Sequence, residues 1–128
     1  MKKVLRVLSG LVGVLFLANL SGWIFDPASA ADGLGMPLLD GVGRSTQIGD
    51  VGAFFLAVSA LSLVGALREK PDLLRAAALL LGGAAVLRIF AWMAHDAAFT
   101  AGFIVAEVLA AGVLLATASQ FSRAGSSD

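Results

Sequence analysis

The chain has 128 residues, of which 59% are hydrophobic and 14% are charged, and its formal net charge at pH 7 is zero. This composition is too apolar and too poor in charge for an ordinary soluble domain, so it predicts a chain embedded in lipid. The zero net charge and the lack of a long basic run argue against a nucleic-acid partner. The absence of cysteine excludes disulfides and thiolate-based metal or catalytic sites.

The first predicted membrane span covers residues 7–25. It contains no charge and follows Lys2, Lys3 and Arg6, an arrangement typical of a span whose positive flank stays in the cytoplasm. The alternative is a cleaved signal peptide, because Ala28-Ser29-Ala30 has the small residues of a cleavage site. The apolar run is longer than the hydrophobic region of a usual signal peptide, which favours a retained span.

Residues 26–47 form the one long connection between predicted spans. It contains Pro27, Pro37, several glycines and three acids, so we expect it to lie outside the bilayer core or to fold back against the bundle. Within it lie apolar residues suited to a segment that rests on the membrane surface, namely Leu34, Met36, Leu38 and Leu39. The sequence therefore predicts a cap over one mouth of the bundle.

Three further apolar stretches complete a set of four predicted spans, at residues 7–25, 48–67, 73–93 and 97–121. Charged turns separate the second, third and fourth spans. Little of the chain is left over for a second domain. We therefore predict one all-α integral membrane domain over residues 1–128, a four-transmembrane-helix up-down bundle.

Positive residues are distributed unevenly over the two sides that this topology defines. One side carries only Arg44, if Arg88 is counted as intramembrane, and the other carries Lys2, Lys3, Arg6, Arg68, Lys70, Arg75 and Arg123. The positive-inside rule then predicts a multi-pass protein of the bacterial inner membrane with both termini in the cytoplasm. Trp23 and Trp92 are expected at the outer interface, where indole rings are favoured. Small residues recur at a spacing of four in every span, but they do not identify a dimer face. A homo-oligomer is therefore compatible with the sequence but is not predicted by it.

Ionisable residues inside the spans are the informative ones. A charge at the bilayer centre costs about 2.5 to 3.5 kcal/mol even on insertion scales, so such residues need partners. Asp50, Arg88 and Glu107 are all expected in the outer half of the membrane, and Asn19 could join them from the first span. The simplest arrangement puts the Arg88 guanidinium between the two carboxylates.

Three functions are compatible with this polar cluster. The first is binding of a small lipophilic ligand or a partner at an outer-leaflet polar pocket. The second is a small membrane enzyme, an isomerase or hydrolase of a lipophilic substrate, with Glu107 or Asp50 as acid or base and Arg88 stabilising negative charge. The third is a purely structural network that fixes helix register. A cavity lined by the trio favours the first two functions, and a dry, fully paired trio favours the third.

Arg44 and His95 complete the candidate ligand-binding residues, although a turn at the membrane surface is an ordinary place for a histidine. One histidine cannot supply a two-histidine haem site, and zinc finds too few ligands, so we expect neither a metal nor a cofactor. The glycines and hydroxyls of residues 41–52 could bind an anion, or Ser45 or Thr46 could cap the second helix. The expected partners are membrane lipid and a lipophilic small molecule.

Some of these residues also carry a family resemblance. They lie at three places, namely Phe25-Asp26-Pro27 after the first span, Gly43 to Asp50 at the start of the second, and then Arg88, His95 and Glu107 in that order. At these places the chain resembles the bacterial family catalogued as domain of unknown function 4345. The resemblance covers about residues 3–118. It implies a small four-helix bacterial membrane protein, more distantly similar to DoxX-like proteins. It implies no established activity and therefore leaves the function open.

Overall fold

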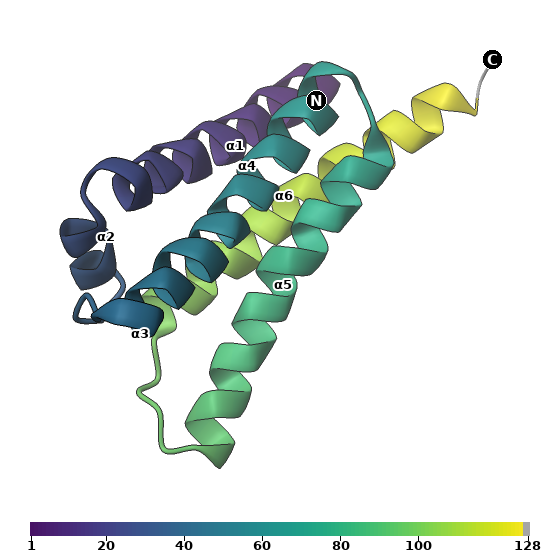
Figure 1. Ribbon diagram of the computed structural model, residues 1–128. Coiled ribbons are helices and arrows are strands. Elements are labelled where there is room, and N and C mark those ends of the chain that lie inside the picture. Colours follow the sequence, from purple (N-terminus) through teal and green to yellow (C-terminus); the bar gives the residue numbers. More distant parts are fainter. Residues whose placement is uncertain (127–128) are drawn as a thin grey trace.

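The computed structural model describes residues 1–126, and their regular structure is helical throughout, with no strand (Figure 1). The four long helices are α1 (Lys2–Phe25), α4 (Gly52–Leu67), α5 (Pro71–Ala94) and α6 (Ala101–Gly125). Between α1 and α4 lie α2 (Pro27–Gly33), α3 (Gly41–Thr46) and the π-helical turn η1 (Gln47–Val51). Because α3, η1 and α4 are continuous, the second apolar helix extends over Gly41–Leu67. The all-α prediction is confirmed, and four helices are long and apolar enough to cross a membrane.

The four long helices form two pairs that pack against each other. Helix α1 packs mainly on α4 and α5 mainly on α6, while contacts of α4 with α5 and of α1 with α6 join the pairs. The start of α1, the end of α6 and the turn at residues 68–70 lie at one end of the bundle, here called the termini end (Figure 1). The connection at residues 26–47, here called the cap, and the loop at residues 95–100 lie at the other end, the cap end.

Helix boundaries follow local signals that hydropathy does not contain. Pro71 opens α5 at a position where its missing N–H costs nothing, and Asp26 caps α2 by accepting a hydrogen bond from the Ser29 amide. The sequence predicts a fourth span from residue 97, but α6 begins only at Ala101. The chain turns at Asp96, whose φ is 53°, and the next apolar residues form a loop because composition alone does not start a helix.

The main core lies in the half of the bundle nearer the termini end. Fully buried side chains from α4, α5 and α6 meet there, including Val58, Leu74, Leu81 and Leu114. Helix α1 comes close to α4 at Gly13, where an added Cβ would lie 2.6 Å from Leu63 Cγ. The absence of a side chain at this position therefore permits the close approach of the two helices.

A buried hydroxyl pair ties α1 to α6 in the same half. The Ser9 and Thr117 hydroxyl oxygens are 2.7 Å apart, and both side chains are fully buried. The carbonyl oxygens of Leu5 and Val113 lie 3.1 and 2.8 Å from Thr117 Oγ1, and either can accept the hydrogen bond that this hydroxyl donates. Since water is scarce in such a core, these mutual bonds satisfy groups that would otherwise be costly to bury.

The turn after α4 is held by an ion cluster at the termini end. Lys2 Nζ and Arg6 Nη1 lie 2.7 and 3.0 Å from the Glu69 carboxylate, and Arg6 Nη2 donates to the Leu67 carbonyl at 2.9 Å. The hydrogen bond from Lys2 lowers the pKa of the Glu69 carboxyl below its ordinary value. The charges of Lys2 and Arg6 act in the same direction, and partial desolvation opposes them. This cluster joins the start of α1 to the α4–α5 turn.

Trp23 differs from the expectation for an interfacial tryptophan. It does lie toward the cap end, but it is only 2% exposed because α2 folds back over it and brings Ala31 and the cap residues Leu34 and Met36 against it. Trp92, in contrast, is 48% exposed near the end of α5. The sequence did not indicate that the cap covers Trp23, and the position of both tryptophans at the outer interface stays a prediction.

Candidate binding cavity

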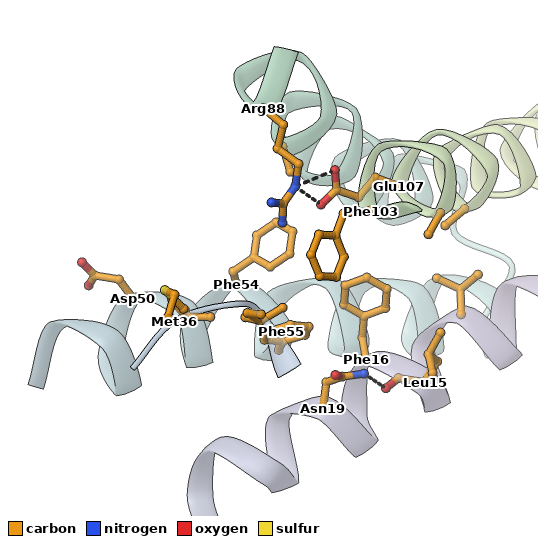
Figure 2. A pocket seen from close by; sticks show the side chains of 16 residues that line it. Leu15, Phe16, Asn19, Met36, Asp50, Phe54, Phe55, Arg88, Phe103 and Glu107 are labelled. Atoms are coloured by element: carbon orange, nitrogen blue, oxygen red, sulfur yellow. Dashed lines mark hydrogen bonds and ion pairs between the residues drawn. The ribbon is translucent and has the colours of Figure 1, made fainter. Parts of the chain in front are cut away.

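Arg88 of α5 and Glu107 of α6 form an ion pair inside the bundle (Figure 2). The Arg88 Nε donates to both Glu107 oxygens, at 2.9 Å to Oε1 and 3.2 Å to Oε2. The guanidinium carbon lies 4.8 Å from the ring centroid of Phe103, so the cation also rests against an aromatic ring. The Glu107 side chain is 10% exposed, whereas that of Arg88 is 34% exposed.

The two residues meet because the α5–α6 hairpin places them at the same depth. Arg88 precedes the last residue of α5, Ala94, by six positions, and Glu107 follows the first residue of α6, Ala101, by six. At a rise of about 1.5 Å per residue, each lies about 9 Å from the helix end that adjoins the loop. The predicted contact between Arg88 and Glu107 is therefore confirmed.

A cavity of about 570 Å³ lies beside this pair. Its walls come from α1, the cap, η1, α4, α5 and α6. Most of the lining is apolar, and the polar residues that line it are Asn19, Asp50, Arg88 and Glu107. Such a space, mostly apolar with a few placed polar groups, has the make-up of a small-molecule site.

The size of the side chains explains where the cavity lies. On the α1–α4 side, the rings of Phe16, Phe54 and Phe55 form a cluster with centroids 5.4 to 6.2 Å apart. Besides Phe103 and the ion pair, the facing helices α5 and α6 contribute only alanines, at positions 84, 106 and 110. Small residues opposite a cluster of rings leave space that the fold itself does not fill.

Asp50 does not join the ion pair, so the predicted trio is wrong. It is exposed in η1 at the edge of the cavity, and within residues 1–126 its carboxylate has neither a hydrogen bond nor an ion pair. Figure 2 shows its carboxyl group pointing away from Arg88. The prediction used depth in the membrane, but the π-helical turn also sets the direction of the side chain.

Three other predicted site residues lie elsewhere or make local bonds. Asn19 lines the cavity but its Nδ2 donates to the carbonyl of Leu15 in its own helix, at 2.9 Å. The Arg44 Nε donates to the Leu39 carbonyl at 2.7 Å and its Nη2 pairs with Asp40, so this residue holds the cap and does not line the cavity. His95 is exposed after α5 and stacks edge-on against Phe90.

Gln47 is the important residue that the sequence reasoning missed. It is buried, its Oε1 accepts from the Leu39 amide at 2.8 Å, and its Nε2 donates to the Pro37 carbonyl at 3.0 Å. These bonds fasten the segment that carries Met36 onto η1, and Met36 lines the cavity. A lone amide at the start of an apolar run is the signal that could have identified it.

The start of the second helix also differs from the predicted cap. The helix begins at Gly41, so Ser45 and Thr46 lie inside α3 and do not cap it. Gly41 has a φ of 53°, a conformation that favours glycine at this entry. Within the described residues no three His, Asp or Glu side chains lie close enough together to hold a metal ion.

Comparison with known proteins adds no relative. No family model matches the chain, and neither a curated protein nor a solved structure matches it. The resemblance drawn from residues 43–50 and from the later polar residues stays a prediction. The cavity and the side chains that line it are therefore the observations that bear on function.

Proposed function

We propose that this chain is a multi-pass membrane protein, an up-down four-helix bundle that binds a small lipophilic molecule in the cavity beside Arg88 and Glu107. The observation that carries the proposal is the cavity itself. Its volume of about 570 Å³ lies within the range of roughly 300 to 1,000 Å³ that small-molecule sites occupy. Its lining combines aromatic rings, alanines and one ion pair.

The outer surface of the helices supports placement in a bilayer. Large apolar side chains are exposed on all four long helices, among them Leu11, Leu56, Leu79 and Leu109. A water-soluble protein rarely exposes so much contiguous apolar surface, whereas lipid tails accept it. Helices of 24 to 27 residues also reach across a hydrocarbon core about 30 Å thick.

The charge distribution supports an orientation for the proposed binding site. Seven of the nine Lys and Arg residues belong to the termini end, and only Arg44 belongs to the cap. The positive-inside rule then favours a cytoplasmic termini end in a bacterial inner membrane, with the cap outside. In this orientation the cavity lies in the outer half of the bilayer, where a lipophilic molecule could enter from the outer leaflet.

Partial exposure of the ion pair favours binding over a purely structural role. A structural pair in an apolar bundle gains most when both partners are enclosed and fully bonded. Here Glu107 is nearly buried while Arg88 remains 34% exposed beside the cavity. A ligand in this space would add packing contacts to side chains that have none on that side.

Blocking the cavity tests the proposal. Ala106 and Ala116 are both exposed residues of α6, but only Ala106 lines the cavity. The protein would be purified from membranes in mild detergent, and small lipophilic molecules retained by wild type, Ala106→Phe and Ala116→Phe would be quantified by mass spectrometry. We expect a species that wild type and Ala116→Phe retain and Ala106→Phe loses. Identical retention by all three proteins would overturn the proposal.

A further inference from the structure

We infer that the cavity selects an uncharged lipophilic molecule whose head carries a hydrogen-bond-accepting oxygen, such as an ester or ketone, and that the terminal amino groups of Arg88 hold this oxygen. The inference rests on the proposed function and names the class of ligand for the same site. It follows from the way in which Glu107 occupies only one edge of the guanidinium.

Glu107 uses only one of the nitrogen atoms of Arg88. Both carboxylate oxygens accept from Nε, at 2.9 and 3.2 Å. The two Nη atoms carry four further N–H groups, and these make no hydrogen bond to any residue from 1 to 126. Figure 2 shows them on the side of the guanidinium away from Glu107, near Phe54 and Phe103.

Donors in apolar surroundings favour a ligand that can accept hydrogen bonds. The rings of Phe54 and Phe103, which lie beside the guanidinium in Figure 2, offer no acceptor to the Nη groups. A polar group left unbonded in such surroundings is unfavourable, so an acceptor oxygen at the Nη groups would be bound in preference to a hydrocarbon. Contact with the Phe103 ring, 4.8 Å from the guanidinium carbon, holds the donors in a fixed direction.

Charge decides between a neutral acceptor and an anion. The Arg88–Glu107 pair is neutral as a unit, because Glu107 already compensates the charge of Arg88. An anionic head would therefore bring an uncompensated negative charge into a largely apolar space. A cationic head would be repelled by Arg88. An ester or ketone oxygen accepts the hydrogen bonds without adding any charge.

Four probes with similar alkyl chains separate these classes, namely methyl laurate, dodecane, laurate and dodecylamine. Their affinities would be measured at neutral pH by native mass spectrometry of the protein released from lipid nanodiscs. We expect methyl laurate to bind wild type about tenfold more tightly than each of the other three, the effect of roughly one net hydrogen bond to a charged donor. Ala106→Phe should weaken all binding, and Ala116→Phe should not.

A paired substitution assigns the preference to Arg88. In the double variant Arg88→Met with Glu107→Leu, methyl laurate and dodecane should bind equally, because the donors are gone and no carboxylate is left unpaired. The matched control is Arg75→Met with Asp72→Leu, which removes another ion pair of α5 that lies at the termini end. This control should keep the tenfold preference.

The wild-type ranking alone can overturn the inference, even if the double variant does not fold. Tighter binding of laurate or dodecylamine than of methyl laurate would assign the site to a charged ligand. Equal binding of methyl laurate and dodecane would show that the Arg88 donors do not favour a ligand with an acceptor oxygen over a hydrocarbon. In either case, binding blocked by Ala106→Phe would leave the proposed function standing. If none of the probes binds, both the inference and the proposed function fall.

Discussion

Arg88 Nε bonds to both oxygens of Glu107, so one N–H of the guanidinium holds an entire carboxylate inside the bundle. Arg88→Ala should therefore leave a nearly buried carboxylate without its cation and lower the free energy of unfolding by about 1 to 3 kcal/mol. The double change Arg88→Met with Glu107→Leu should recover most of that loss. Thermal unfolding in detergent measures both effects. If the effects of the single changes Arg88→Met and Glu107→Leu add up to that of the double change, the residues do not interact.

Glu107→Gln separates binding from acid–base chemistry. The amide oxygen can still accept from Arg88 Nε, but the side chain can no longer ionise. If the site only binds, the variant should fold, insert and restore whatever phenotype deletion of the gene produces. If the variant is stable in membranes but fails to complement, the carboxyl group has a chemical role, and the enzymatic hypothesis gains over the binding one.

Gln47→Leu should loosen the cap without changing the bundle. The substitution leaves the Leu39 amide and the Pro37 carbonyl without their partner, at a cost of about 1 to 3 kcal/mol. Faster proteolysis within residues 34–40 would report the loosening. Gln120→Leu on α6 is the control and should be cleaved as slowly as wild type. Equal cleavage of Gln47→Leu and wild type would show that these bonds do not hold the cap.

The termini end should lose stability in acid through Glu69. Because the bond from Lys2 lowers the pKa of Glu69 in the folded protein, its contribution is fully present above the pKa of the unfolded chain. It is lost as the pH falls through the lowered pKa. Wild type should therefore melt at a higher temperature than Glu69→Gln at neutral pH, and the difference should shrink on acidification. A difference that stays constant with pH would contradict this assignment.

Labelling in spheroplasts tests the proposed orientation. A cysteine at Gly35, in the exposed part of the cap, should react with a membrane-impermeant maleimide. A cysteine at Ser122 near the end of α6 should react only after the membrane is permeabilised. The native chain has no cysteine, so each variant carries one reactive site. Labelling at Ser122 in intact spheroplasts would overturn the orientation with both termini in the cytoplasm.

The sequence predicted what depends on composition and on depth. Four apolar stretches suffice to find four long helices, and the short loop between α5 and α6 fixes Arg88 and Glu107 at one level. The direction in which a side chain points was harder to predict from the sequence. Asp50 points away because of a π-helical turn, which hydropathy does not reveal, and Trp23 is buried because α2 folds back. The position of Gln47 in an apolar run marks it as unusual, but its role depends on the backbone groups of Leu39 and Pro37, eight and ten residues before it, and the sequence does not show which groups it bonds.

The pairing of the helices has a mechanical consequence. Arg88 and Glu107 both belong to the α5–α6 pair, whereas the cap and its Gln47 bonds belong to the α1–α4 side. The buried hydrogen bond between Ser9 of α1 and Thr117 of α6, which joins the two helix pairs, lies toward the termini end. A motion that parts the two pairs at the cap end would therefore break neither the ion pair nor the cap. The termini end would act as the hinge, and the cavity would widen with its polar groups still in place.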